Sequence, residues 1–184
     1  YYNTIIIHFM KKLFIIPFIV LTTTLISCKS KVNDDNKNFA IPQQECPEGI
    51  NLIPMYGHAK KCQAQLDADK KFIKHVLQNY GTLKDGAVEH IRMGWQYFGN
   101  HNFETAMKRF NQAWLLDSLN ADVYWGFGCV LGKQGQTDEA IEMFDRSISI
   151  DPNNPFVYKN RSTAKNKKYN ETNNIKYLDE ARAD

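Results

Sequence analysis

The stretch "GKQGQTDEAIEMFDRSISIDPNN", residues 132–154, decides the fold. Its first residues, with two glycines, are typical of a turn. The apolar residues that follow recur every three or four positions, with Ala140, Phe144 and Ile148 on one stripe. Pro152 ends such a helix because its ring clashes with the preceding turn. The stretch therefore predicts a turn, an amphipathic helix and a stop.

The same pattern occurs once before in the chain, and the two occurrences align without a gap. The two copies are residues 87–120 and residues 121–154, so each position of one copy has an equivalent in the other. Each copy divides into two amphipathic helices joined by a turn. A fixed period of this kind is the signature of repeat architectures. The matching pairs are Gly94 and Gly128, Ala106 and Ala140, Phe110 and Phe144, and Asp117 and Asp151.

Small and aromatic residues alternate at the positions where the two helices of a copy should cross. Glycine and alanine let helix axes approach closely, and phenylalanine fills the space beside the crossing. We therefore predict that six residues pack the repeats together: Gly94, Ala106, Phe110, Gly128, Ala140 and Phe144.

This pattern resembles the tetratricopeptide repeat (TPR). The second copy carries the resemblance at Tyr124, Phe127, Gly128, Leu131, Gly135, Ala140, Phe144 and Pro152. The first copy departs from it at His90, His101 and Ser118. The resemblance implies an all-α fold, a short TPR-type helical solenoid, because one helix pair cannot bury its own apolar face and must stack on neighbours.

Both ends of the predicted stack have a candidate cap. Residues 155–184 align without a gap as a degenerate third copy, with Asn174 where the small packing residue is expected. Residues 52–86 form the expected N-terminal capping segment, which contains one helix, 63–80, with Gly81 just past its end. The predicted apolar stripe of that helix comprises Leu66, Ile73, Val76, Leu77 and Tyr80.

The N-terminal segment predicts an export signal. Residues 10–27, "MKKLFIIPFIVLTTTLIS", hold two lysines and an apolar run too short to span a bilayer comfortably. Cys28 follows, and residues 25–28 resemble the bacterial lipobox, which implies fatty acylation of Cys28 and anchoring to a membrane of the cell envelope. The alternative is an ordinary signal peptide with a chance cysteine. Residues 1–9 are interpreted as upstream sequence before the true start, Met10.

A polar segment, residues 28–51, is predicted to be a flexible tether between the anchor and the helices. Cys46 and Cys62 either form a disulfide that fastens this tether or remain free thiols, and both alternatives stay open. Cys129 is interpreted as a packing residue of the second copy. Removing residues 1–27 lowers the net charge from +3 to about +1, so no basic surface for nucleic acid is expected.

The sequence offers no recognisable catalytic, cofactor or metal site. The histidines at 58, 75, 90 and 101 lack partners at metal-ligand spacing, no nucleophile elbow occurs, and no cysteine has a plausible histidine base. We therefore expect a non-enzymatic protein without a cofactor.

The resemblance implies that partners bind on the concave face lined by the first helix of each copy. The positions that face it include Trp95, Phe98, Trp125, Lys133, Lys159 and Lys167. This set would suit a peptide with apolar anchors and an acidic end. Alternatively, Trp95 and Phe98 pack against the capping helix at 63–80.

Three functions remain open at this stage. The first is a lipid-anchored adaptor that binds a protein or peptide partner, on the periplasmic or surface side of what we expect to be the outer membrane. The second is a structural subunit of an envelope assembly complex. The third is an enzyme or small-ligand carrier, for which the sequence offers no residues.

Overall fold

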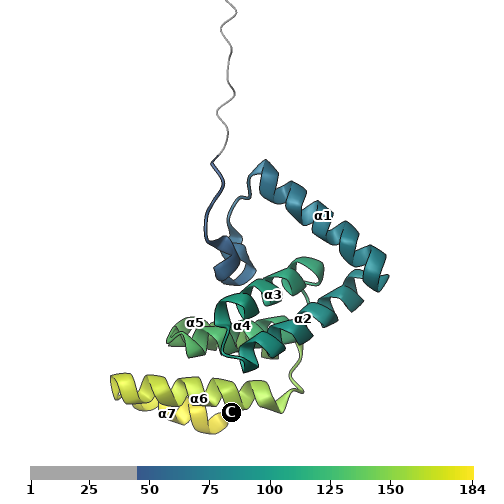
Figure 1. Cartoon of the computed structure of the whole chain (residues 1–184). Coiled ribbons are helices and arrows are strands. Elements are labelled where there is room, and N and C mark those ends of the chain that lie inside the picture. Colours follow the sequence, from purple (N-terminus) through teal and green to yellow (C-terminus); the bar gives the residue numbers. More distant parts are fainter. Residues whose placement is uncertain (1–44) are drawn as a thin grey trace, which may run out of the picture. The chain divides into compact units, whose positions relative to one another are not determined.

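A computed structural model describes residues 45–184 of the chain, and every regular element in that part is a helix (Figure 1). The all-α prediction is therefore confirmed. The predicted upstream residues, the signal, Cys28 and most of the tether lie outside the described residues. Two short 3-10 helices, η1 (Ile50–Leu52) and η2 (Pro54–His58), precede seven α-helices: α1 (Gln63–Tyr80), α2 (Leu83–Gly99), α3 (Phe103–Leu116), α4 (Ala121–Lys133), α5 (Thr137–Ile150), α6 (Pro155–Thr172) and α7 (Ile175–Ala183).

The helices pack as consecutive pairs. The first pair is α2 with α3, the second is α4 with α5, and the third is α6 with α7. Neighbouring pairs touch mainly through α3 with α4 and α5 with α6. Because each pair buries its apolar face against the next, the core runs through the stack, as expected for a solenoid.

Asparagine side chains begin most of these helices. Asn102, Asn120, Asn154 and Asn174 each accept a hydrogen bond from a backbone N–H in the first turn of α3, α4, α6 and α7 respectively. Asparagine is among the best N-cap residues because its side chain satisfies a donor that the helix leaves free. The repeated placement of asparagine thus fixes where the helices start.

The two inter-helix turns of the clear copies share one left-handed position. Gly135 has φ 85° there, and His101, at the equivalent position of the first copy, has φ 58°. Left-handed backbone costs energy for residues with a Cβ and little for glycine. The first pair therefore keeps the turn geometry of the second in spite of its histidine.

Glycines make room for the phenylalanine rings at the helix crossings. A Cβ on Gly94 would come within 2.5 Å of Phe110, and one on Gly128 within 2.5 Å of Phe144. Gly126 in α4 also contacts Phe110, where a Cβ would come within 2.4 Å of the ring. Phe110 thus lies between two glycines of successive pairs, and Gly126 was not among the predicted packing residues.

Helix α1 has the predicted bounds but buries only part of the predicted apolar stripe. Val76 is fully buried, and Phe72 and Ile73 pack beside it, whereas Leu66 and Leu77 of the predicted stripe are 42% and 44% exposed. The reason lies in α2, where Gly86 leaves a gap that Val76 fills. Only one side of α1 therefore reaches the first pair. The prediction was wrong for Leu66 and Leu77, whereas the Tyr80 ring contacts His90 of α2.

The folded region begins earlier than the predicted tether boundary at Asn51. Cys46 and Cys62 form a disulfide, which settles the alternative that the sequence left open in favour of the bond. Ile50 is only 6% exposed. The disulfide closes residues 46–62 into a loop that lies on α3, so the end of the predicted tether belongs to the domain.

Asn111 of α3 holds this loop in an unusual conformation. Its amide accepts a hydrogen bond from the Tyr56 N–H at 3.2 Å and donates to the carbonyls of Asn51 at 3.0 Å and Ile53 at 2.8 Å. Residues 55–58 all have positive φ, a run that includes three non-glycine residues. A strained backbone of this kind is retained only where surrounding contacts stabilise it strongly. Buried Asn111 and Tyr56, together with the disulfide, provide those contacts.

The third pair departs from the ungapped register. Helix α6 continues to Thr172, and the left-handed residue of its turn is Asn173. Asn174 is the N-cap of α7 rather than the small packing residue, so that alignment was wrong. No glycine interrupts residues 155–172, and α6 therefore runs about one turn past the end of its counterpart α4. Ala181 is buried instead, beside Ser162, whose hydroxyl donates to its carbonyl at 2.7 Å.

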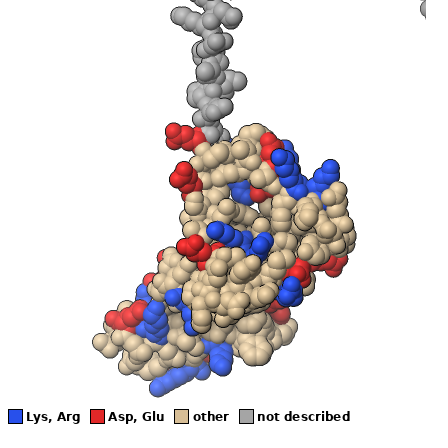
Figure 2. All heavy atoms as spheres, viewed as in Figure 1, with Lys and Arg blue, Asp and Glu red and all other residues tan. Residues whose placement is uncertain are grey.

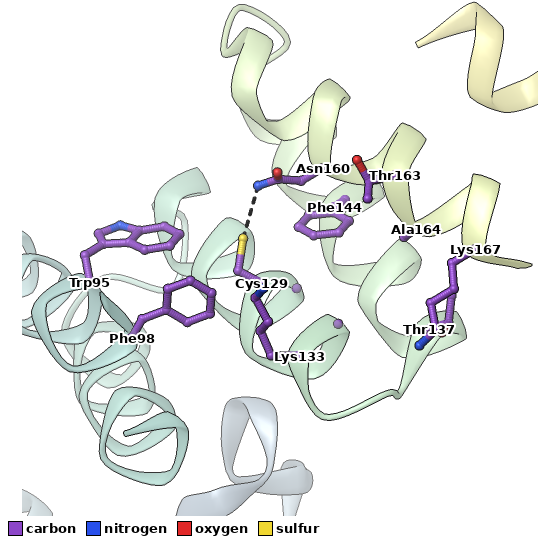
Figure 3. A pocket seen from close by; sticks show the side chains of 12 residues that line it. Trp95, Phe98, Cys129, Lys133, Thr137, Phe144, Asn160, Thr163, Ala164 and Lys167 are labelled. Atoms are coloured by element: carbon purple, nitrogen blue, oxygen red, sulfur yellow. Dashed lines mark hydrogen bonds between the residues drawn. The ribbon is translucent and has the colours of Figure 1, made fainter. Parts of the chain in front are cut away.

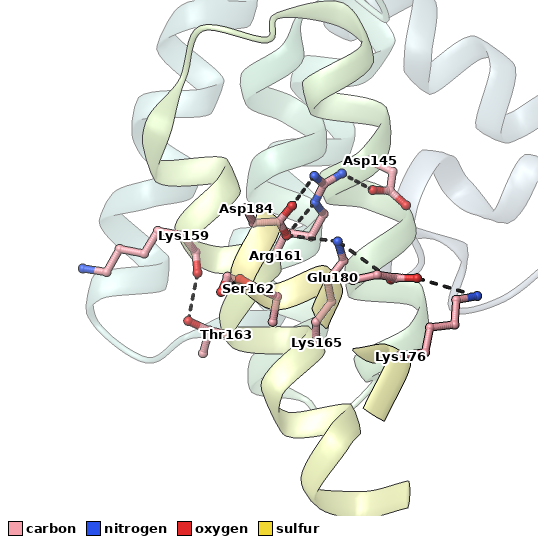
Figure 4. A network of polar contacts seen from close by, with 10 residues as sticks. Asp145, Lys159, Arg161, Ser162, Thr163, Lys165, Lys176, Glu180 and Asp184 are labelled. Carbon is pink, nitrogen blue, oxygen red and sulfur yellow. Dashed lines mark hydrogen bonds and ion pairs between the residues drawn. The ribbon is translucent and has the colours of Figure 1, made fainter. Parts of the chain in front are cut away.

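Ion pairs fasten α7 to the rest of the stack (Figure 4). Arg161 of α6 donates to both carboxylate oxygens of Asp184 and also to Asp145 of α5. Lys165, which is almost fully buried, reaches Asp184 at 3.1 Å. The end of the stack thus combines a small apolar core with a network of paired charges.

Candidate binding groove

The first helices of the three pairs place equivalent residues side by side. We call the surface formed by α2, α4 and α6 the groove. Equivalent positions of the three copies line it in three rows: Ile91, Trp125 and Lys159; Trp95, Cys129 and Thr163; and Gly99, Lys133 and Lys167.

A cavity of about 350 Å³ opens in this groove between the second and third pairs (Figure 3). We call it the Cys129 cavity. Helix α2 contributes Trp95 and Phe98 to it, and α4 contributes Gly128, Cys129, Gly132 and Lys133. Thr137 and Phe144 come from α5, and α6 supplies Asn160, Thr163, Ala164 and Lys167. In Figure 3 the two aromatic residues of α2 stand on one side, with Lys167 and Thr137 on the opposite side.

Four of the six predicted groove residues line this cavity: Trp95, Phe98, Lys133 and Lys167. Trp125 is not part of the lining but contacts the lining residue Trp95, with ring centroids 4.5 Å apart. Lys159 is not part of the lining. Asn160 and Thr137 line the cavity but were not predicted. Asn160 could have been found by comparing equivalent positions, since its counterpart in the second copy is Gly126.

The cavity exists because the central row has a much smaller side chain in the second pair than in the first. Trp95 covers Phe110 in the first pair, with an edge-to-face arrangement and centroids 5.3 Å apart. The equivalent residue in the second pair is Cys129, which is too small to cover Phe144 in the same way. The Phe144 ring therefore forms part of the cavity wall.

Aromatic rings connect the three first helices next to the cavity. Trp95 contacts Trp125, and Trp125 stacks on Phe156 of α6 with an interplanar angle of 15°. The rings next to Phe98 are those of Trp95 and Phe103, and both Trp95 and Phe98 pack on the core of the stack, separate from the cluster that α1 joins. The alternative that Trp95 and Phe98 pack on the capping helix was therefore wrong. Phe156 stays 60% exposed and marks the open end of this row.

Cys129 sits in the cavity as a neutral thiol. The Asn160 amide donates to its sulfur at 3.2 Å. Burial raises the pKa of the Cys129 thiol to about 12, so it is protonated at neutral pH. A thiol in this state is a poor nucleophile, and its contribution to the cavity is its small size.

The charge on the cavity wall is positive. Lys133 takes part in no ion pair within residues 45–184, and Lys167 has only an exposed pair with Glu171 at 3.7 Å. No aspartate or glutamate is among the lining residues that the structure describes. On the face that Figure 2 shows, lysine and arginine residues are interspersed with aspartate and glutamate.

The remaining polar residues of interest have structural surroundings. His90 is buried, its Nδ1 lies 2.8 Å from the Gly86 carbonyl, and burial lowers its pKa. Within the described residues no three histidine, cysteine, aspartate or glutamate side chains come together as a metal site would require. Among the helices at 45–184, none combines the length and apolar character needed to cross a bilayer.

Comparison with known proteins identifies the repeat. Residues 121–154 match the family profile described as "Tetratricopeptide repeat". No curated protein matches the chain. Two crystal structures of MamA align with it, one at 25% identity and a TM-score of 0.45 and the other at 24% and 0.46. They cover 63% and 66% of this chain, and 61% and 68% of the MamA chains, so the first alignment spans less than two thirds of its MamA chain. Residues 121–154 are a tetratricopeptide repeat, and the part of the chain that the structure describes is a short all-α helical solenoid built around it.

Proposed function

We propose that this protein is a non-enzymatic adaptor that binds a protein partner in the groove formed by α2, α4 and α6. The observation that supports this most is the Cys129 cavity, which has apolar walls and two lysines and opens onto the groove. Concave, mostly apolar sites with a few convergent polar groups are the usual form of binding sites. The tetratricopeptide repeat is typically a scaffold for protein contacts rather than for catalysis.

The proposal includes a lipid anchor in the bacterial envelope. Its support is the sequence alone, in which a short apolar run ends at Cys28 in a lipobox-like tetrapeptide. Acyl chains on Cys28 would hold the domain at a membrane, with the groove free to meet partners there. The Cys46–Cys62 disulfide supports an oxidising compartment, because structural disulfides are rare in the cytosol.

Crosslinking in the native cell followed by mass spectrometry tests the adaptor function. We expect wild-type protein to yield a specific protein partner, and the Lys133→Glu/Lys167→Glu variant to lose it. The matched control is Lys70→Glu/Lys176→Glu, which makes the same charge change at exposed lysines of α1 and α7, outside the groove. Retention of the partner by the groove variant and its loss from the control would place binding elsewhere, as expected for a structural subunit held by another surface.

The anchor has a separate test. Cys28→Ser should release the protein from the membrane fraction, and continued sedimentation of this variant with membranes after extraction of peripheral proteins would refute acylation at Cys28.

A further inference from the structure

We infer that the Cys129 cavity is an anchor pocket for one large apolar side chain of an acidic peptide, and that the size of Cys129 sets this selectivity. The inference rests on the proposed protein-binding function and names the chemistry of its ligand. It also assigns Cys129 a role beyond packing.

The aromatic residues that line the apolar part of the pocket are held in place by their neighbours and cannot move in to fill it. Trp95 is held by Phe110 and Trp125, and Phe144 is held against Gly128. These rings are fixed in place, and no side chain of residues 45–184 fills the space of about 350 Å³. A cavity of this size with aromatic walls suits a bulky aliphatic or aromatic group better than a few water molecules.

Two lysines determine which charge the ligand carries next to its apolar group. Lys133 and Lys167 occupy equivalent positions on α4 and α6, and both line the cavity. Lys133 has no carboxylate partner within the described part of the chain, and the pair of Lys167 with Glu171 is exposed and readily exchanged. A ligand with acidic residues next to its apolar anchor would supply the missing charges, and a basic ligand would be repelled.

Cys129 controls access to the pocket by being small. In the first pair the equivalent residue is Trp95, and its side chain fills the corresponding space. There, Trp95 covers Phe110, and Gly94 and Gly126 close on the Phe110 ring from successive helices. In the second pair Cys129 replaces the tryptophan, and Asn160 stands where Gly126 does in the first. The Asn160 amide is held by the Cys129 sulfur. The Phe144 ring, which is 3% exposed, consequently lies at the cavity wall, whereas Phe110 in the first pair is fully buried.

Selection from a display library of random peptides tests this inference with full-length protein in detergent. Wild-type protein should enrich sequences with one large apolar residue beside aspartate or glutamate. Cys129→Trp should lower the binding of the enriched peptides at least tenfold, whereas Cys129→Ser, which adds no bulk, should change it less than threefold. Lys133→Glu/Lys167→Glu should remove the acidic preference while the apolar preference remains.

A second variant covers the case in which Cys129→Trp disturbs folding. Thr163 is an exposed residue of α6 on the opposite wall, so Thr163→Trp can fill the cavity from a position that tolerates bulk. Circular dichroism and a melting curve verify the fold of each variant. Unchanged binding by a folded Cys129→Trp or Thr163→Trp overturns the inference, as does selection of peptides without an apolar anchor.

The outcomes separate this inference from the function on which it rests. If crosslinking identifies a partner that depends on the groove but cavity-filling variants still bind it, only the anchor pocket is refuted. If wild-type protein neither selects peptides nor crosslinks to a partner, both the pocket and the adaptor function fail.

Discussion

The ring of Phe110 in α3 lies against Gly126 in α4, close enough that a Cβ at residue 126 would come within 2.4 Å of the ring. This contact joins the first helix pair to the second, and it depends on the absence of a side chain at Gly126. The fit of one ring against one glycine therefore contributes directly to the stability of the stack.

Gly126→Ala should destabilise the protein because the added methyl group forces the fully buried Phe110 to move. Overpacking of this kind costs about 1 to 3 kcal/mol, or a fall in melting temperature of about 3 to 8 °C. Gly99→Ala is the control, since a Cβ there meets nothing within 4 Å. Thermal unfolding followed by circular dichroism should separate the two variants, and equal melting temperatures would contradict the packing described for Phe110.

His101→Gly should stabilise the first pair. His101 has φ 58° at the position where the second pair has glycine, and removal of the Cβ relieves the strain of that left-handed backbone. After the larger entropy loss of glycine on folding, we expect a gain of about 0.5 to 1 kcal/mol in the free energy of unfolding. Urea denaturation measures this gain. Gly135→Ala is the reciprocal variant and should lose stability, and a loss from both substitutions would count against shared turn geometry.

Reduction of the disulfide should loosen residues 46–62. Closing a loop of this length stabilises a protein by about 3 kcal/mol in the chain-entropy account, and the strained residues 55–58 rely on that closure. In Cys46→Ser we expect faster hydrogen exchange over residues 50–58, while exchange in α4 and α5 stays unchanged. Uniform acceleration over the whole domain would instead mean that the loop and the stack unfold as one unit.

Asp184 should make stability depend on acid pH. Burial alone would raise the pKa of its carboxyl group, but hydrogen bonds from Arg161 and Lys165 outweigh burial and hold the pKa below its usual value. A carboxylate with a lowered pKa in the folded state stabilises the protein above the unfolded pKa, about 3.9, and this contribution is lost as pH falls through the folded pKa.

Asp184→Asn therefore should cost about 2 kcal/mol at pH 6, since it leaves Arg161 and Lys165 without their common partner. The difference from wild type should shrink below pH 4 and approach zero once Asp184 is protonated. Urea denaturation at a series of pH values measures it. A difference that stays constant down to pH 2 would show that the charge of Asp184 does not matter.

The repeat period predicted most of this architecture because the packing residues are determined locally. Gly94, Phe110, Gly128 and Phe144 recur at one spacing, and the crossing that they build is the same in both pairs. The bounds of α1 were likewise predictable, since Gly81 follows its last residue and ends it. Contacts within a helix pair can therefore be predicted from residues that recur in the sequence.

Contacts between elements that do not repeat could not be predicted in this way. Leu66 and Leu77 of α1 stay exposed because Gly86 on the next helix leaves room for Val76, which therefore becomes the residue that α1 buries. Helix α6 ends later than α4 does in its copy because no glycine occurs where the turn would begin. An ungapped alignment does not take this difference into account. The Cys129 cavity depends on differences between equivalent positions, so a method that looks for similarity passes over it.

The bond between Cys46 and Cys62 also determines how the domain responds to mechanical load. Cys62 is the N-cap of α1, so tension applied through the chain before Cys46 crosses the two sulfur atoms and enters α1 directly. Residues 47–61, with their left-handed turn, stay outside this path and are spared from stretching. Tension that reaches the domain through the chain before Cys46 therefore enters the stack at α1, without first stretching the strained residues 55–58.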